Sequence, residues 1–381
     1  MADRSFETGP IRPPSEANSL LLQVTQGCTW NKCKFCVVYR GSQFHMLQPE
    51  KVKQNIDNMA YFRDMIKSFS RPDGHLDKES LYAELEKMTQ DELQCFYLVY
   101  NWLSHGGKSV FLQDGNSIAL KPEKLADILF YLREKFPHIE RITTYGRAET
   151  LSRWSVEQLK LLRESGLDRI HTGFESGSDN VLHMINKGLT QKQEIEGGLK
   201  VKEAGMELSV YFMPGIGGVG FSDENASETA KVVNEISPDF VRLRTFVLKT
   251  DSEMYDMLQR GEFEECSDMM KLAEIRSLIA AITAPDVNIV SDHIVNLIGN
   301  MNGRIGSDKE RLLAQADRVL QLPKEEQRLY QLTRRHGIIE DLPQLSMLPP
   351  QRREHLQHIC DSYKDETLWE AHINSILRQY V

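Results

Sequence analysis

The chain has 381 residues, of which 40% are hydrophobic and 27% are charged, which is the balance of a globular protein. Its formal net charge of −9 disfavours a broad basic surface for nucleic acid or anionic lipid. A local basic groove is still compatible with this charge. No uncharged apolar run approaches the roughly 18 residues that a membrane span needs, and the N-terminus has no apolar signal core. We therefore expect a cytoplasmic protein without a membrane partner.

The first part of the chain combines a polar start with one apolar run. Residues 1–18 are polar and proline-bearing, which predicts a loose leader. The apolar run 19–25 predicts a buried strand, and a cysteine-rich segment follows it directly. Residues 61–108 are expected to form a helical insertion, with a polar turn at Pro72, Asp73 and Gly74. The expected helices here are 49–69 and 78–103.

From residue 109, short apolar runs alternate with helical patterns. This alternation predicts βαβ units and a parallel sheet. With the first strand it gives six β/α repeats over 19–250, which predicts an α/β fold with a partial TIM-like (β/α)6 barrel. The expected strands are 110–112, 141–145, 169–174, 208–213 and 240–247. The expected helices are 122–135, 155–165, 191–204 and 224–236.

After residue 250 the alternation weakens, and the chain is expected to be mostly helical over 251–381. This C-terminal extension and the insertion are candidates for a lid over a closed site. The expected helices of the extension are 272–283, 309–322, 324–335 and 350–363.

Three of the six cysteines crowd into a short segment. Cys28, Cys33 and Cys36 have C-x4-C-x2-C spacing at the end of the first strand, where parallel α/β folds bind ligands. Crowding in a cytosolic chain predicts metal binding rather than disulfides. The remaining three lack close spacing and are expected to be buried thiols. They are Cys95, Cys266 and Cys360.

Three thiolates on one loop can bind one face of a [4Fe–4S] cluster, which normally takes four cysteines. One iron then stays open, and S-adenosylmethionine could fill it through its amino and carboxylate groups. Zinc with a distant fourth ligand such as His45 is the alternative. The position of the cysteines after the first strand of a βα series disfavours zinc.

Here the sequence resembles the radical S-adenosylmethionine (radical SAM) superfamily. The residues Thr25-Gln-Gly-Cys28, the cysteine triad, and Phe35 before the last cysteine carry the likeness over about 19–250. The likeness is closest to the branch with oxygen-independent coproporphyrinogen oxidase, the elongator catalytic subunit and the methylthiotransferases. The commonest family spacing is C-x3-C-x2-C, so this chain has one extra residue.

The resemblance implies a [4Fe–4S] cluster and S-adenosylmethionine as cofactors, and an external one-electron donor of flavodoxin or ferredoxin type. It implies reductive cleavage of S-adenosylmethionine to a 5′-deoxyadenosyl radical that abstracts hydrogen from a substrate. A small-molecule substrate is favoured. The alternatives are modification of tRNA or of a protein, and a non-catalytic relative that carries a cluster or haem. His171 and His183 are possible haem ligands in that last case.

Several cofactor contacts follow from the resemblance. Glu175 and Ser176 match the family's G-x-E-S segment and could bind the ribose hydroxyls or the methionine ammonium. The alternative is a solvated turn before a helix capped by Ser178 or Asp179. Gly215 and Gly217 resemble the glycine-rich segment that contacts adenine, although a Pro-Gly turn is a common structure in its own right.

Two further positions have weaker counterparts in the family. Asp114 stands where the family often has Gly-Gly-Glu to hold the methionine amino group, so this chain departs from the pattern. Phe35 resembles the aromatic neighbour that covers the cofactor, and its alternative role is loop packing.

Polar residues near later strand ends are candidates for substrate contact or catalysis. Arg242 and Arg244 alternate along the sixth strand, so they either face inward to a carboxylate or lie in solvent. Asp292 and His293 could position substrate or move a proton, but a helix cap at Ser291 or Asp292 is the favoured interpretation. Tyr145 is a weaker candidate at the end of the third strand.

Overall fold

The computed structural model describes residues 3–71 and 76–380. They form two compact units. The boundary between the units passes through the cysteine segment, strand β6 (Arg169–Glu175) and helix α8 (Gln191–Glu203). The turn expected at Pro72, Asp73 and Gly74 lies outside the described residues. The first unit contains 3–31, 38–71, 76–171 and 200–207, and the second contains 32–37, 172–199 and 208–380.

The first unit is built on parallel strands. Strand β1 pairs with β4, β4 with β5, and β5 with the first half of β6, in each case parallel. The strands are short and almost wholly buried, as expected for a sheet covered on both faces. A small antiparallel pair, β2 with β3, follows β1. The strands are β1 (Leu20–Gln23), β2 (Thr25–Gln26), β3 (His45–Met46), β4 (Ser109–Gln113) and β5 (Arg141–Tyr145).

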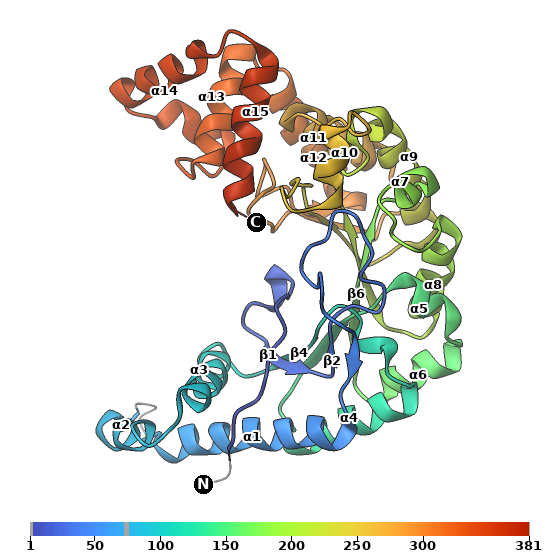
Figure 1. The fold of residues 1–381 in the computed structure, drawn as a ribbon, viewed down its shortest axis with the longest axis vertical. Helices are drawn as coiled ribbons and strands as arrows, with labels where there is room; N and C mark the ends of the chain where they lie inside the picture. Colours follow the sequence, from blue (N-terminus) through green and yellow to red (C-terminus); the bar gives the residue numbers. More distant parts are fainter. Residues whose placement is uncertain (1–2, 72–75, 381) are drawn as a thin grey trace. The chain divides into compact units, whose positions relative to one another are not determined.

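Helices cover the strands of the first unit. Helix α1 packs against α3 and α4, and α4 packs against α6 (Figure 1). The single helix expected over 78–103 is wrong, because Thr89 and Glu92 form a capping box that starts a new helix. The helices are α1 (Pro49–Ser68), α2 (Lys78–Leu85), α3 (Gln90–Ser104), α4 (Pro122–Lys135), α5 (Ala148–Arg153) and α6 (Val156–Glu164), with 3-10 turns η1 (Pro14–Glu16) and η2 (Ser117–Ala119).

The N-terminal segment is packed rather than loose. The side chain of Phe6 is only 7% exposed, and its backbone N–H lies 3.1 Å from the Sγ atom of Cys95. The amide of Gly9 donates to Gln113 Oε1 at 2.9 Å, and Gln113 Nε2 donates back to the Gly9 carbonyl at 3.0 Å. A buried aromatic ring and this paired amide therefore fix a segment whose composition predicted mobility.

The second unit continues the parallel pattern. Strand β7 pairs with β8, and β8 pairs with β9, both parallel, whereas β10 is antiparallel to β9. The strand expected over 240–247 ends early, because the Thr245 amide bonds to the Asn296 side chain at 3.0 Å instead of to a strand. The strands are β7 (Glu207–Phe212), β8 (Phe240–Leu243), β9 (Asn288–Val290) and β10 (Gly303–Arg304).

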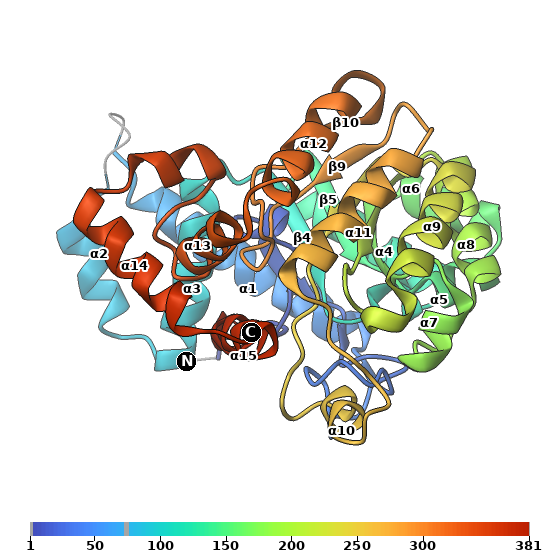
Figure 2. The ribbon, with the colours of Figure 1, turned by 90° about the horizontal axis from the view of Figure 1, so that it is seen from above.

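The helices of the second unit form two groups. Helix α11 contacts both α9 and α12 (Figure 2), and α13 contacts both α14 and α15 (Figure 1). The expected α/β fold with a mostly parallel sheet and a helical C-terminal region is confirmed. The helices are α7 (Asp179–Met184), α9 (Gly218–Ile236), α10 (Glu253–Gln259), α11 (Asp268–Ala281), α12 (Ile305–Leu320), α13 (Lys324–Arg335), α14 (Pro350–Ser362) and α15 (Glu366–Leu377), with 3-10 turns η3 (Leu342–Met347) and η4 (Arg378–Tyr380).

The expected domain division into 1–18, 19–250 and 251–381 stays a prediction. Within the described residues, no helix is both long enough and apolar enough to cross a membrane.

Replacing Phe6 by Ala tests whether the N-terminal segment is part of the folded core. We expect the free energy of unfolding to fall by about 3 kcal/mol, because a buried aromatic side chain is lost. Urea denaturation measures the change. The control is Tyr82→Ala at a side chain that is 58% exposed, which should change the free energy by less than about 0.5 kcal/mol. Equal effects of the two variants would mean that the segment contributes no packing.

Candidate cofactor site

The cysteines fall into two classes by burial. The three thiols within 28–36 are each partly exposed, whereas Cys95, Cys266 and Cys360 are buried, as expected. Burial raises the pKa of the Cys266 thiol to about 12 and that of Cys360 to about 11, and it also raises the pKa of Cys95. Metal ligands must be deprotonated, so the three buried thiols are poor candidates for a cluster.

The donor set of the cysteine segment fits an iron–sulfur cluster. Three partly exposed cysteines lie within nine residues, and thiolates are the usual ligands of such clusters. Among the described residues, no three or more His, Cys, Asp or Glu side chains are arranged to hold a metal ion. The ligand assignment therefore rests on the cysteine pattern, and metal binding itself organises such ligands. His45, the alternative fourth ligand for zinc, is exposed on β3.

In the first unit, the carboxylate of Asp114 anchors the start of the cysteine segment. Its Oδ2 atom accepts from Gln23 Nε2 at 2.8 Å and from the Gly27 amide at 3.0 Å, and its Oδ1 atom accepts from the Tyr39 hydroxyl. Asp114 is buried and has a φ of 93°, a strained conformation for a non-glycine residue. The contacts within the chain thus use both carboxylate oxygens of Asp114 to fix the loop. A contact to S-adenosylmethionine stays a prediction.

The two residues after Asp114 also contact the start of the cysteine segment. The Gly115 amide donates to the Gly27 carbonyl at 3.2 Å, and a Cβ at Gly115 would lie 3.0 Å from Cys28 Cβ. A side chain at position 115 would be tight there, so glycine favours the close approach of the turn after β4 to Cys28. Asn116 Nδ2 donates to Thr29 Oγ1 at 3.0 Å, so the residue after Cys28 is also fixed.

In the second unit, the end of the cysteine segment packs on an apolar cluster. The Lys34 amide donates to the Ile185 carbonyl at 2.9 Å, and the Lys34 carbonyl accepts from the Met254 amide at 3.3 Å. Phe35 is partly buried against the same cluster, and Lys187 Nζ lies 6.0 Å from its ring centroid. Loop packing is therefore observed for Phe35, and a role in covering the cofactor stays a prediction. The cluster contains Val181, Ile185, Met213, Ile216, Phe246, Leu248, Met254, Met257 and Phe263.

Glu175 is held in an unusual position at the end of β6. Its φ is 68°, and its Oε1 atom accepts from Lys187 Nζ at 2.8 Å. The carboxylate folds back over Gly173, where a Cβ would lie 2.2 Å from Glu175 Oε1. Glu175 is therefore paired and largely buried rather than solvated. The adjacent Ser176 is fully buried, and the expected cap is confirmed because Ser178 caps α7.

A second carboxyl group near this pair has no partner of its own. Glu194 of α8 is fully buried, and neither of its oxygens has a hydrogen-bond partner within the described residues. Burial raises its pKa well above the usual value. Lys187 opposes this shift, and Glu175 and Asp179 add to it. Glu194 is therefore a buried carboxyl group whose protonated form is favoured by burial, close enough to Glu175 and Lys187 to feel both charges.

The turn after β7 carries the predicted glycines. Gly215 has a φ of 83° and Gly217 precedes the first residue of α9. The Gly215 amide donates to Glu274 Oε1 at 3.1 Å. The backbone conformation at Gly215 requires glycine, so the turn is more specific than an ordinary Pro-Gly turn. Contact with adenine stays a prediction for both glycines.

The two arginines near the end of β8 differ in environment. Arg242 is 4% exposed, donates from Nε to Ser209 Oγ at 3.0 Å, and forms an ion pair with Asp292. Arg244 follows the last strand residue and is exposed. Burial lowers the pKa of His293 to about 4, and the charge of Arg244 adds to this effect. His293 is therefore neutral near pH 7 and is a poor proton donor.

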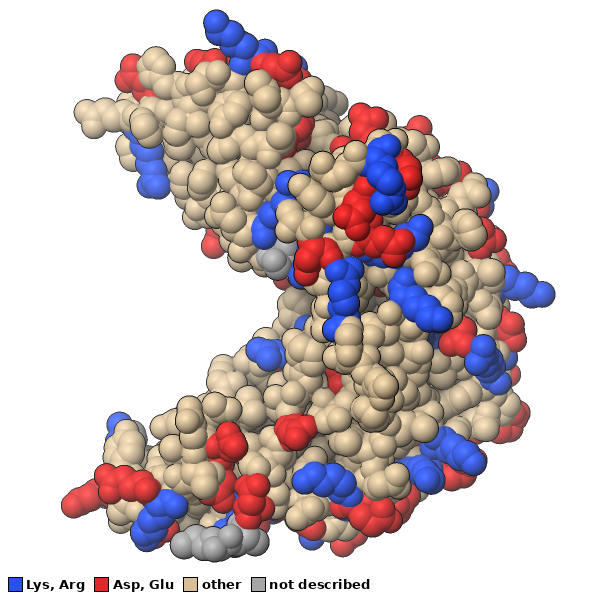
Figure 3. All heavy atoms as spheres, in the orientation of Figure 1, with Lys and Arg blue, Asp and Glu red and all other residues tan. Residues whose placement is uncertain are grey.

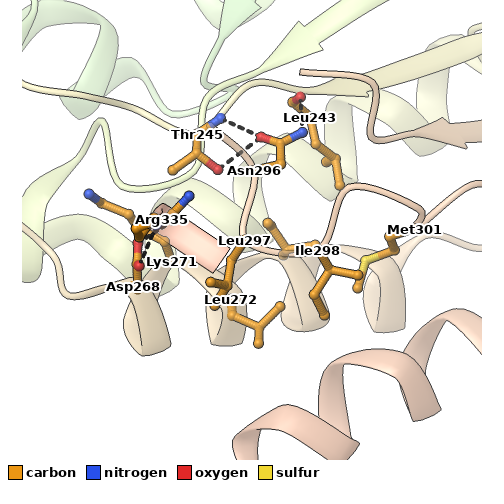
Figure 4. Close-up of a pocket in the computed structure, with 11 residues that line it drawn as sticks. Leu243, Thr245, Asp268, Lys271, Leu272, Asn296, Leu297, Ile298, Met301 and Arg335 are labelled. Atoms are coloured by element: carbon orange, nitrogen blue, oxygen red, sulfur yellow. Dashed lines mark hydrogen bonds and ion pairs between the residues drawn. The ribbon is translucent and has the colours of Figure 1, made fainter. Parts of the chain in front are cut away.

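The expected helix cap at Ser291 or Asp292 is wrong. No helix begins between β9 and β10 among the described residues; the segment is a loop held by side chains. Asn296 Nδ2 donates to the Leu243 carbonyl at 2.7 Å, and Asn296 Oδ1 accepts from Thr245 (Figure 4). Ser291 Oγ donates to the Ile298 carbonyl at 2.6 Å. The loop therefore gains its shape from Asn296, not from a helix.

The remaining candidates, Tyr145, His171 and His183, differ in burial and in packing. In the first unit, the Tyr145 ring packs edge-on against Phe111 at 5.1 Å and lies 6.1 Å from His171. His171 is fully buried 3.6 Å from Glu16, which disfavours it as a haem ligand. In the second unit, His183 is exposed on α7. A catalytic role for Tyr145 stays a prediction.

Besides Glu194, four residues that hold these loops within the two units were not singled out from the sequence. Tyr39 and Gln23 bind Asp114, Lys187 binds Glu175, and Glu274 binds Gly215. The sequence around Tyr39, Lys187 and Glu274 contains no motif that marks them as loop anchors. Gln23 could have been found, since a polar residue at the end of an apolar strand often faces a ligand site.

Comparison with known proteins identifies the chain's relatives. The profile of the radical SAM superfamily matches residues 22–230. 4′-Phospho-dehydrooxetanocin synthase from Priestia megaterium is 24% identical over 199 residues, which cover 51% of this chain and 23% of that protein. A tRNA-2-methylthio-N(6)-dimethylallyladenosine synthase from Syntrophus aciditrophicus is 31% identical over 140 residues, covering 35% and 30%. The heme chaperone HemW from Bacillus subtilis is 21% identical over 156 residues, covering 40% of each. The matched part is less than half of each relative.

Replacing Asp114 by Ala tests its role as an anchor of the cysteine segment. We expect reconstituted iron per chain to fall by at least about twofold, because the Gly27 amide, Gln23 and Tyr39 lose a charged acceptor. Iron and protein assays measure this. The control is Asp127→Asn, which breaks an exposed pair with Lys53 in the same unit. Full iron content in the Asp114 variant would show that the loop holds without it.

Replacing Glu194 by Gln tests whether this residue is a buried neutral acid. Because its folded pKa is raised, its stability contribution is complete below the unfolded pKa and is lost as pH rises towards the folded pKa. The variant should therefore gain stability over the natural chain by about 1.4 kcal/mol per pH unit within that window. Urea denaturation between pH 5 and 8 measures the difference. Glu203→Gln, at an exposed position of α8, should show a flat difference.

Proposed function

The chain belongs to the radical SAM superfamily, and from this premise we propose that it holds a [4Fe–4S] cluster on Cys28, Cys33 and Cys36 and cleaves S-adenosylmethionine reductively. The observation that carries the proposal is the partial exposure of these three thiols within the matched residues 22–230, while the other three cysteines are buried. Held by these three cysteines, the cluster would provide one-electron reduction of bound S-adenosylmethionine, the chemistry that would yield methionine and a radical able to remove a hydrogen atom from the substrate.

The residues of the chain then bind and orient the cofactor. Glu175 and Ser176 would accept hydrogen bonds from the ribose hydroxyls or from the methionine ammonium. Lys187 would fix the position of the Glu175 carboxylate. Gly215 and Gly217 would let the backbone approach the flat adenine ring. Phe35 would cover the cofactor from the cysteine segment, and Asp114 would hold the start of that segment. An external donor of flavodoxin or ferredoxin type would supply the electron.

The polar groups near β8 and β9 are better suited to binding than to proton transfer. Arg242 and Asp292 neutralise each other, and His293 is uncharged near pH 7. Arg244 is exposed and could pair with a carboxylate of the cofactor or the substrate. Among the described residues, these groups near β8 and β9 therefore offer hydrogen bonds and the exposed cation of Arg244, which suits a reaction whose difficult chemistry belongs to the cofactor.

A small-molecule substrate fits the surface better than a nucleic acid. The formal net charge is −9, and acidic and basic side chains are interspersed on the face shown in Figure 3. The matched relatives include a synthase named for a small phosphorylated product and a synthase named for a modified tRNA. Modification of tRNA or of a protein is therefore the second candidate. A non-catalytic role has support from the heme chaperone relative alone.

Anaerobic reconstitution with iron and sulfide tests the proposal. We expect about four irons per chain and formation of 5′-deoxyadenosine when S-adenosylmethionine and dithionite are added. The triple variant Cys28→Ala, Cys33→Ala and Cys36→Ala should lose both, because the ligand thiols are gone. Cys360→Ala, which removes a buried thiol, should keep both. A cluster without cleavage would favour the non-catalytic alternative, and zinc in place of iron would end the proposal.

Binding of transfer RNA separates the two catalytic candidates. If tRNA is the substrate, its affinity should fall by orders of magnitude between about 50 and 200 mM salt, because phosphate contacts release counterions. For a small-molecule enzyme we expect no saturable binding at 150 mM salt. Filter binding with the reconstituted protein distinguishes the two results.

A further inference from the structure

Helix α11 carries a column of buried charged side chains. Asp268, Lys271 and Glu274 are spaced three residues apart, so they follow one another along one side of the helix. All three are almost fully buried. Burial of charge is costly unless the group is paired or hydrogen-bonded, so each of the three needs partners from other elements.

Glu274 fixes the turn that carries Gly215. Its Oε1 atom accepts from the Gly215 amide at 3.1 Å and from Asn225 Nδ2 at 2.5 Å. Its Oε2 atom accepts from Ser222 Oγ at 2.6 Å. Both Ser222 and Asn225 belong to α9, so one carboxylate ties the glycine turn to two helices. A charged acceptor makes these hydrogen bonds stronger than neutral ones.

Lys271 connects the same turn to the end of the chain. A Cβ at Gly215 would lie 2.8 Å from Lys271 Cε, so the aliphatic stem of the lysine packs directly against the turn. Lys271 Nζ lies 3.7 Å from Glu265 Oε1, and Glu265 Oε2 accepts from Arg378 at 2.9 Å. Arg378 is in η4, next to α15, so a chain of contacts leads from Gly215 to the C-terminal helices.

Asp268 connects α11 to another C-terminal helix. Arg335, the last residue of α13, donates from Nε to Asp268 Oδ2 at 2.9 Å and from Nη2 to Oδ1 at 2.6 Å. The pair lies beside Lys271 (Figure 4), and both partners are buried. Arg335 Nη1 also donates to the Val295 carbonyl at 2.8 Å. The two-pronged pair leaves little freedom between α11 and α13.

From these contacts we propose that α11 transmits the docking of the C-terminal helices α13 and α15 to the Gly215 turn, and that Glu274 is the positioning residue that sets this turn for the adenosyl part of S-adenosylmethionine. The identity of the ligand rests on the proposed function. The coupling between the helices and the turn rests on the contacts alone. The C-terminal extension is then part of the cofactor-binding machinery.

The coupling has a characteristic pH dependence. Burial raises the pKa of Glu274 to about 7, against the opposing effects of its hydrogen bonds and of Lys271. The ionised carboxylate accepts all three hydrogen bonds, whereas the protonated acid has one acceptor site fewer. Besides Lys271, the Cys266 thiol interacts with it electrostatically and stays neutral, since its pKa is about 12. The turn should therefore be held more firmly as pH rises through about 7.

The experiment uses the full-length reconstituted protein and three variants. Glu274→Gln removes the charged acceptor, Arg378→Gln removes the contact from η4, and Asp317→Asn breaks the partly exposed pair between α12 and Arg276 of α11 as a control. Hydrogen–deuterium exchange is measured over residues 213–218, and binding of S-adenosylmethionine is measured by equilibrium dialysis from pH 6 to 8. Iron content is measured in each sample.

We expect Glu274→Gln to speed exchange in the turn and to weaken S-adenosylmethionine binding, each by about tenfold at pH 8, the effect of a lost charged hydrogen bond. The affinities of the natural chain and of this variant should converge towards pH 6, because the natural Glu274 is then protonated. Arg378→Gln should act in the same direction by a smaller factor, and Asp317→Asn should change nothing. Iron content should be equal in all samples.

The outcomes separate this inference from the proposed function. Unchanged exchange and affinity in Glu274→Gln, or a tenfold difference that is independent of pH, would overturn the positioning role. Faster exchange only in Glu274→Gln, with Arg378→Gln like the natural chain, would overturn the coupling to the C-terminal helices. Failure of the natural chain to bind S-adenosylmethionine would overturn the ligand assignment, while accelerated exchange in both variants would still support the coupling.

Discussion

The carboxylate of Asp114 is the interaction on which the cysteine segment most depends. It receives a backbone amide from Gly27, a side-chain amide from Gln23 and a hydroxyl from Tyr39, so it joins the ends of two strands to residues on both sides of Cys28. The strained backbone of Asp114 persists because these partners over-determine its position. A loop that presents several thiols needs such an external constraint, because nine residues cannot build a core of their own.

In the second unit, too, buried polar side chains accept hydrogen bonds from backbone amides of loops at strand ends. At the ends of parallel strands the backbone leaves the sheet, and its amides need new acceptors. Glu274 supplies one to Gly215, and the Asn296 side chain supplies one to Thr245. Buried polar side chains from later parts of the chain thus replace the lost strand partners. These loops can therefore stay irregular without leaving the Gly215 and Thr245 amides unpaired.

The sequence predicted regular elements well and tertiary polar contacts poorly. Helices α4 and α13 match the expected ranges at both ends, because a proline at or just before the first residue and a clear apolar period define them locally. The break between α2 and α3 was missed, although Thr89 and Glu92 form a recognisable capping box. The cysteine motif could be recognised in the sequence from its spacing, and its role as a ligand set stays a prediction. The partners that hold it were not, because Tyr39 and Asp114 are 75 residues apart and nothing in either neighbourhood points to the other.

Most residues that the sequence suggests as catalytic have contacts with other side chains of the chain. Asp292 pairs with Arg242, His293 is uncharged at neutral pH, and Tyr145 packs in an aromatic group with His171. An enzyme that moved protons with its own side chains would need a titratable group poised near its working pH and facing the substrate. Among the described residues, burial raises the pKa of Glu274 and of Glu370, a residue of α15, to about 7; Glu274 is buried and Glu370 is partly buried. Glu274 uses its carboxylate to hold a backbone turn, which is positioning rather than chemistry. This arrangement supports the proposed function, in which a bound cofactor would carry the difficult chemistry and buried side chains such as Glu274 would position loops.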